Sequence, residues 1–169
     1  MEELRSIAIG TAGLSVALLI AAALTLGRRP VGWDTRTRDA LVRLLVVAIA
    51  VQGIHFGEEL LTGFQRSFPA LLGLVPWSIA FFVSFNVAWL ALWVLSAFGL
   101  KAGYRPVFFP IWFLALAMLA NGIAHPLLGV ATGGYFPGLY TSPAVGIVGI
   151  FLMSRLLRVT ASGRREATG

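Results

Sequence analysis

Two histidines and two adjacent glutamates lie inside apolar stretches of this chain. The histidines are the only two it has, and they stand in His55-Phe-Gly-Glu58-Glu59 and Asn121-Gly-Ile-Ala-His125-Pro. Ionisable side chains inside a bilayer are costly unless they are paired, face a cavity or lie at the interface. Residues of these types in such surroundings predict a functional site.

A metal centre is the chemistry that this set favours. His55 and Glu59 are one helical turn apart, so both can reach one ion, and His125 can join them from a second helix. Two imidazoles and a carboxylate make a three-ligand site that keeps an open position for water. We expect His55, Glu59 and His125 as ligands and Glu58 as the general base. The spacing differs from the common zinc signatures, so zinc, iron and manganese all stay open.

Three other interpretations use the same residues. A carboxyl group in an apolar pocket, paired with a histidine, can carry out metal-free acid–base catalysis, such as isomerisation or cyclisation of a sterol- or isoprenoid-like substrate. An intramembrane His–Glu relay can also serve a proton- or ion-coupled carrier. An internal repeat is a usual sign of a carrier, and the sequence shows none. In the plainest interpretation the cluster only joins helices by hydrogen bonds.

The elements that carry these residues are membrane spans. The chain has 169 residues, of which 58% are hydrophobic and 12% charged, and its mean hydropathy is +0.87. Because a helical span needs about 20 mostly apolar residues, the sequence predicts an all-α integral membrane bundle of five transmembrane helices. The expected spans are 5–27, 40–62, 76–100, 106–128 and 139–157. They form one transmembrane domain, 1–160, which a polar tail, 161–169, follows.

The basic residues gather on one side of the predicted bundle. Of the thirteen Lys and Arg residues, eleven lie within 28–43, within 101–105 or after 154, and only Arg5 and Arg66 lie elsewhere. The positive-inside rule therefore places the N-terminus outside and the C-terminus in the cytoplasm. We expect a multi-pass protein of a bacterial cytoplasmic (inner) membrane, in contact with lipid and not with nucleic acid. The acidic start favours a retained first span over a cleaved signal peptide.

Helical geometry places the polar residues on shared faces. Four polar residues between 52 and 59 form one stripe, which faces away from Gly53 and Gly57. These glycines make a G-x-x-x-G pair, so we expect a neighbouring backbone to approach closely there. Asn121 and His125 share a face of another span. At 1.5 Å per residue both polar faces fall at a similar depth, in the outer part of the membrane.

The loop between the last two expected spans is rich in glycine and proline. It runs from Gly129 to Pro143 without a charge, which favours a tight turn or a partly re-entrant lid. We expect Tyr135 and Thr141 to stand at the mouth of the site and to donate hydrogen bonds from this lid. We expect Asn121 to orient His125 or the substrate.

Three short motifs occur in order along the chain: His55-x-x-Glu58-Glu59, Asn121-x-x-x-His125 and Tyr135-x-Pro137-Gly138-x-x-Thr141. Together they resemble the HXXEE-motif family of small integral membrane proteins, over roughly residues 40–155. The resemblance implies a multi-span protein with an active site, and it implies no particular reaction. The site residues that it implies are His55, Glu58, Glu59, Asn121, His125, Tyr135 and Thr141.

The sequence thus predicts an enzyme embedded in the membrane. We expect it to depend on a divalent metal and to act near the outer leaflet on a hydrophobic small molecule, lipid-like or isoprenoid, by water-activated hydrolytic chemistry. The metal ligands would be His55, Glu59 and His125. The remaining catalytic residues would be Glu58, Asn121, Tyr135 and Thr141.

Overall fold

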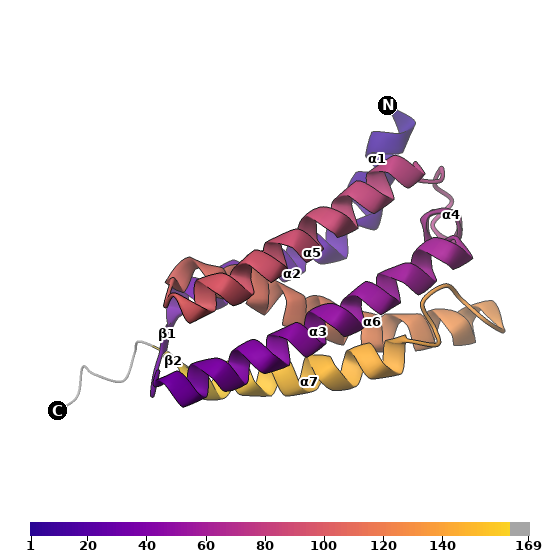
Figure 1. Ribbon diagram of the computed structural model, residues 1–169. Coiled ribbons are helices and arrows are strands. Elements are labelled where there is room, and N and C mark those ends of the chain that lie inside the picture. Colours follow the sequence, from indigo (N-terminus) through magenta and orange to yellow (C-terminus); the bar gives the residue numbers. More distant parts are fainter. Residues whose placement is uncertain (163–169) are drawn as a thin grey trace.

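Long apolar helices run lengthwise beside one another in the computed structural model, which describes residues 1–162 (Figure 1). The seven α-helices are α1 (Glu2–Gly10), α2 (Ala12–Gly27), α3 (Thr35–Thr62), α4 (Phe64–Leu71), α5 (Ile79–Lys101), α6 (Phe108–Thr132) and α7 (Ser142–Val159). A 3-10 turn, η1 (Arg105–Val107), precedes α6, and two short strands, β1 (Arg28–Pro30) and β2 (Thr160–Ser162), pair antiparallel. The predicted polar tail, 161–169, lies outside the described residues from 163 onward.

The predicted all-α class is confirmed, and the number of helices fit to span a membrane is four to five. Helices α3, α5 and α7, and α6 together with η1, are each long and apolar enough to cross a membrane. The bent pair α1–α2 makes a fifth span if the two helices are counted together. These helices are consistent with a multi-pass membrane protein.

The first expected span, 5–27, is broken in two. Helices α1 and α2 meet at a bend of 50°, where Gly10 lies against the indole of Trp77 so closely that a Cβ would overlap the ring. Trp77 Nε1 donates to Ser6 Oγ at 3.1 Å, and Ser6 Oγ donates to Val75 O at 2.7 Å. The segment before α5 therefore holds α1 away from the line of α2. The bend was not predicted, because hydropathy gives the length of an apolar segment and carries no information about a change in its direction.

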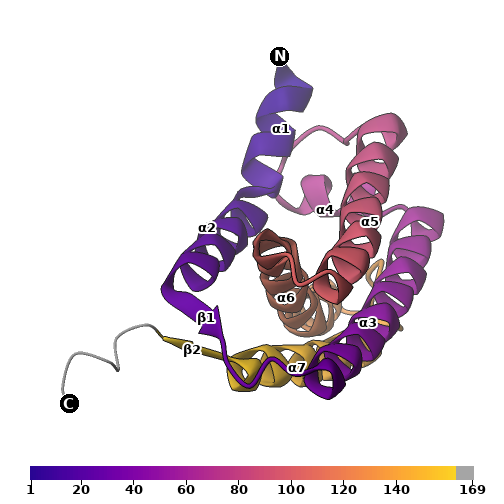
Figure 2. The same ribbon diagram turned by 60° about the vertical axis from the view of Figure 1, so that its left-hand side comes forward.

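Helix α6 lies at the centre of the bundle. Figure 2 shows it between α2 and α5, and it also packs along α7. Trp112, Leu114 and Met118 are fully buried in it. Trp93 Nε1 on α5 donates to Pro110 O at 2.9 Å, so α5 is fixed to the first turn of α6. Helix α3 completes the bundle by packing on α5 and α7.

The closest contact between glycines lies between α6 and α7. A Cβ at Gly122 would overlap the backbone of Gly146. At the expected pair the space is open: a Cβ at Gly53 would meet only Leu90, at 4.0 Å, and one at Gly57 would meet nothing described within 4 Å. The close backbone approach expected at Gly53 and Gly57 is therefore not found among residues 1–162. Two small residues one turn apart permit a close neighbour, but they do not supply one.

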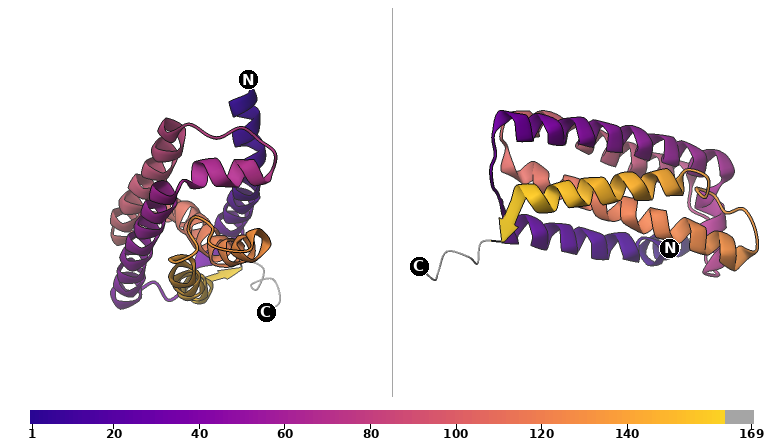
Figure 3. Two further views of the ribbon diagram at one scale, coloured as in Figure 1. Left: turned by 90° about the vertical axis from the view of Figure 1, so that its right-hand side faces the viewer. Right: turned by 90° about the horizontal axis from the view of Figure 1, so that it is seen from below.

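The connections gather at the two ends of the bundle. One end holds β1, β2, η1 and the start of α3, and the other holds α4 and the loop 133–141 (Figure 3). The first end carries most of the basic residues. Neither α4 nor the strand pair was predicted: α4 falls in a stretch expected to be a loop, and a pair of three-residue strands leaves too short a pattern to read.

Replacing Gly122 by alanine tests the α6–α7 contact. We expect Gly122→Ala to lower the free energy of unfolding by about 1–3 kcal/mol, because the added methyl group forces the two backbones apart. Gly57→Ala is the matched control, and it should be neutral or stabilising because alanine favours helix by about 1 kcal/mol. Unfolding in detergent, followed by circular dichroism, measures both. Equal losses would contradict the assignment of the close interface.

Candidate metal centre

Three ionisable side chains meet at the end of the bundle away from the strand pair. His55 and Glu59 stand on the last two turns of α3, and His125 stands on α6. They are 0%, 6% and 2% exposed, and one ligand atom from each lies within 4.8 Å of the others. This buried group could hold a metal ion. The helical spacing of four between His55 and Glu59 brings both to the same side of α3.

The contacts within this group are too long for strong hydrogen bonds. Glu59 Oε1 lies 3.6 Å from His55 Nε2 and 3.3 Å from His125 Nε2. A charge-assisted N–H···O bond is about 2.7–2.9 Å long. The two imidazole rings stand edge to face, with centroids 4.7 Å apart. The three atoms thus face one another across a gap rather than bonding directly.

The hydrogen bonds around the rings assign the proton of each histidine to Nδ1. His125 Nδ1 lies 2.6 Å from Pro137 O, which can only accept. His55 Nδ1 lies 2.7 Å from Thr141 Oγ1, and that hydroxyl already gives its proton to Glu58 Oε2 at 2.6 Å. It must therefore accept from His55. Both Nε2 atoms are left with free lone pairs, as in a histidine that binds metal while its other nitrogen is held by the protein.

Gly138 allows the loop to reach both rings. Its φ is +90°, a value that favours glycine, and a Cβ there would lie 2.5 Å from His125 Nδ1 and 3.0 Å from His55 Cε1. The adjacent Pro137 places the carbonyl that receives the His125 proton. The Pro-Gly pair of the third motif is therefore explained by the approach of the backbone to the two imidazoles.

Glu58 holds the loop closed over the site. Its carboxylate accepts from Tyr135 OH at 2.8 Å, Tyr140 N at 3.0 Å, Thr141 N at 2.8 Å and Thr141 Oγ1 at 2.6 Å. The expected donors Tyr135 and Thr141 thus bond to Glu58. Tyr135 is 41% exposed, and its partial burial raises the pKa of the phenol, with the nearby Glu58 carboxylate adding to the rise. The phenol therefore keeps its proton and remains a donor. The role of Glu58 as general base stays a prediction.

A cavity of about 270 Å³ adjoins the centre. Glu59 and His125 form part of its wall, and it runs along α5 and α6 to the bend between α1 and α2. Most of its lining is apolar, and it includes the aromatic residues Phe64, Phe68, Trp77, Phe81, Phe82, Phe85, Trp89, Trp93 and Phe113. The cavity therefore joins an ionisable centre to a space suited to a hydrophobic molecule.

Two amides on the cavity wall complete the site. Asn121 lines the cavity, and the described partner of His125 Nδ1 is Pro137 O. The role of Asn121 stays a prediction. Gln52 also lines the cavity and is 6% exposed, and its Oε1 has no hydrogen-bond partner among residues 1–162. Gln52 was not among the expected site residues. Its place on the polar stripe, three residues before His55, was the available signal.

Comparisons with protein-family models, with curated proteins and with solved structures give no match to this chain. The likeness to the HXXEE-motif family therefore remains a resemblance carried by the three motifs. The site is therefore defined by its own distances, burial and hydrogen bonds.

Replacing Gly138 by alanine should open the site. We expect Gly138→Ala to destabilise the closed loop by about 1–3 kcal/mol, because the methyl group has no space beside His125 and the backbone conformation is strained. Gly134→Ala is the control in the same loop, since a Cβ there meets nothing described within 4 Å. Hydrogen exchange of the amides of Tyr140 and Thr141 measures loop opening. Unchanged protection in Gly138→Ala would refute the proposed fit.

Proposed function

We propose that this protein is a metal-dependent membrane enzyme that cleaves a lipid-like substrate with an activated water molecule. The observation that supports this most is the meeting of two imidazole lone pairs and a carboxylate oxygen in a buried gap. Without a cation these three groups repel one another in a medium of low dielectric constant. A divalent ion turns the repulsion into attraction.

The donor set suits a catalytic ion. Two histidines and one carboxylate leave an open coordination position, as in catalytic zinc sites. Imidazole and carboxylate ligands also suit iron and manganese, so the choice among these metals is not fixed by ligand type. When bound, the ion supplies a water of lowered pKa and polarises the bond to be cleaved. Thr141 and Pro137 keep both histidines in the tautomer that such binding requires.

The remaining residues have separate tasks in this proposal. Glu58 serves as the general base, and its bonds to the loop 133–141 mean that it reaches the substrate only when that loop moves. Tyr135 and Thr141 close the loop again by donating to Glu58. Asn121 orients the substrate from the cavity wall. Glu58 and the proposed ligand Glu59 are thus neighbours on α3 whose side chains point about 100° apart.

The cavity supports a substrate that has a long apolar part and a small polar group. Its aromatic wall suits an isoprenoid or acyl chain. The amide oxygen of Gln52 lacks a partner, and a buried unpaired acceptor is costly. A hydroxyl or an N–H on the substrate would satisfy it. The proposed substrate is therefore a lipid-like molecule that donates a hydrogen bond close to the bond that is cleaved.

In the proposed orientation the N-terminus lies outside and the C-terminus in the cytoplasm of a bacterial inner membrane. The separation of the basic end from the centre supports it, because arginine-rich ends favour the cytoplasmic side. The centre then opens near the outer leaflet.

Metal content tests the centre directly. We expect the purified protein, produced with added zinc, iron and manganese, to carry about one ion per chain. His55→Ala, His125→Ala and Glu59→Gln should each weaken binding by more than the roughly 10–100-fold that is typical for loss of a residue that only orients a ligand. Asn121→Ala is the control and should keep its metal. Elemental analysis by mass spectrometry, with circular dichroism to check folding, gives the result.

A folded wild type that binds none of the three metals would overturn the metal-dependent proposal. Activity that persists without metal and falls with Glu58→Gln would favour the acid–base isomerase. Proton-driven uptake into proteoliposomes, abolished by Glu58→Gln, would favour the carrier.

A substitution at Gln52 tests whether its amide binds the polar group of the substrate. Gln52→Met removes an unpaired amide, so we expect the free energy of unfolding to rise by about 1–3 kcal/mol. Binding of farnesol, followed by quenching of tryptophan fluorescence, should weaken by roughly tenfold because one hydrogen bond is lost. Gln65→Met is the matched control: Gln65 Oε1 is also buried without a described partner, but it lies outside this cavity. Equal farnesol affinity in both variants would contradict the role of Gln52.

A further inference from the structure

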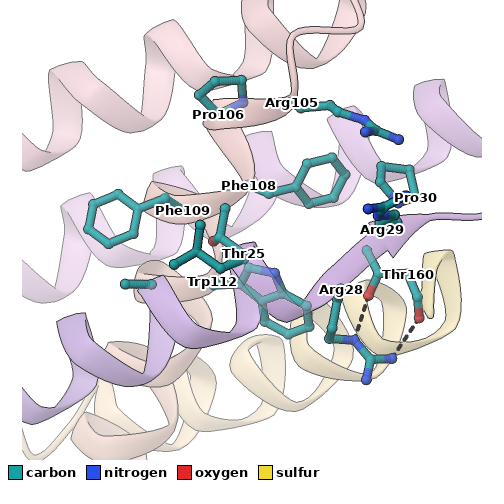
Figure 4. A pocket seen from close by; sticks show the side chains of 12 residues that line it. Thr25, Arg28, Arg29, Pro30, Arg105, Pro106, Phe108, Phe109, Trp112 and Thr160 are labelled. Carbon is teal, nitrogen blue, oxygen red and sulfur yellow. Dashed lines mark hydrogen bonds between the residues drawn. The ribbon is translucent and has the colours of Figure 1, made fainter. Parts of the chain in front are cut away.

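A second cavity, of about 570 Å³, lies at the basic end of the bundle (Figure 4). It is bounded by α2, β1, η1, α6 and β2. Its twelve lining residues are Ala22, Thr25, Leu26, Arg28, Arg29, Pro30, Arg105, Pro106, Phe108, Phe109, Trp112 and Thr160. Three arginines are among them, and no carboxylate is. The cavity shares no lining residue with the candidate metal centre.

Arg28 builds the wall of this cavity. Its Nε donates to Thr160 Oγ1 at 2.8 Å, and one Nη donates to Thr160 O at 2.6 Å and to Leu157 O at 3.0 Å. These bonds join β1 to β2 and to the end of α7. The guanidinium is thereby used in holding the chain together, and it leaves ligand binding to its neighbours.

Arg29 and Arg105 are exposed and reach the cavity from different segments. Arg29 comes from β1 and Arg105 from η1, and their side chains lie toward the same end of the cavity in Figure 4. Within residues 1–162, no ion pair engages either guanidinium. Two cations brought together at one edge, without a described acid beside them, attract an anion. Guanidinium groups bind phosphate oxygens in bidentate fashion.

The rest of the cavity is apolar. Its floor includes Trp112, which is fully buried, and Phe108, which is 5% exposed. Phe109 lies toward the end away from Arg29 (Figure 4). Leu26, on the outer side of α2, is 87% exposed. Free phosphate is hydrophilic and gains no free energy by covering this apolar surface, whereas an acyl chain would bury it away from water.

We propose that this cavity binds one anionic phospholipid, with its phosphate at Arg29 and Arg105 and one acyl chain along α2 and α6. Charge complementarity and the apolar floor both support this occupant. The position at a helix end suits it as well, because basic residues near the surface of a membrane attract anionic headgroups. The headgroup of the lipid would contact β1 and η1, and its acyl chain would lie between α2 and α6. The proposal is independent of the metal centre, since the two sites share no residue.

The test uses the full chain in detergent, with phosphatidylglycerol and phosphatidylcholine as probes and native mass spectrometry as the readout. We expect wild type to retain one phosphatidylglycerol per chain and to prefer it to phosphatidylcholine. The double variant Arg29→Gln/Arg105→Gln should bind phosphatidylglycerol at least roughly tenfold more weakly, because two headgroup contacts are lost. Arg36→Gln is the matched control: Arg36 is also exposed and basic but does not line the cavity. Its affinity should change less than twofold.

A second variant separates a lipid from a free anion. Ala22→Phe fills the apolar part and keeps both arginines, so it should weaken phosphatidylglycerol binding in a protein whose melting temperature is unchanged. Three results would overturn the proposal: equal affinity for the two lipids, equal losses in Arg36→Gln and the double variant, or displacement of the lipid by millimolar inorganic phosphate. The last would identify a site for free phosphate. A melting temperature lowered by Ala22→Phe would leave the arginine pair as the deciding measurement.

Discussion

The hydroxyl of Thr141 connects the parts of the candidate metal centre. It donates to Glu58 and accepts from His55, so one atom joins the loop, the carboxylate that closes it and the tautomer of a candidate ligand. The direction of each bond follows from the others, because a hydroxyl has a single proton to give. In the closed loop, the same hydroxyl therefore leaves the lone pair of His55 Nε2 free.

Two adjacent glutamates can serve different purposes because consecutive helical residues point about 100° apart. Glu58 faces the loop and accepts bonds from Tyr135 and Thr141, whereas Glu59 faces the two histidines. Packing alone does not require two adjacent acids near the end of α3. The pair makes physical sense when one carboxylate closes a lid and the other completes a set of ligands.

The spacing of residues in the sequence predicted the features that belong to a single helix. The spacing of His55 and Glu59 placed them on one side of α3, and the count of long apolar helices agrees with the four to five observed. Contacts between two segments were not predictable: Gly10 lies against Trp77, Gly122 against Gly146, and Gly138 against both imidazoles. No pattern within a single helix contains these partners.

The bend between α1 and α2 forms part of the wall of the cavity beside the centre. Because Trp77 and Ser6 hold α1 toward the segment before α5, α2 leaves the bend at another angle and rests on α6. The first residues of α2 then form a wall of the cavity together with Phe81 and Phe85. The hydrogen bonds of Trp77, far from the histidines in sequence, therefore help to position one wall of the cavity that Glu59 also lines.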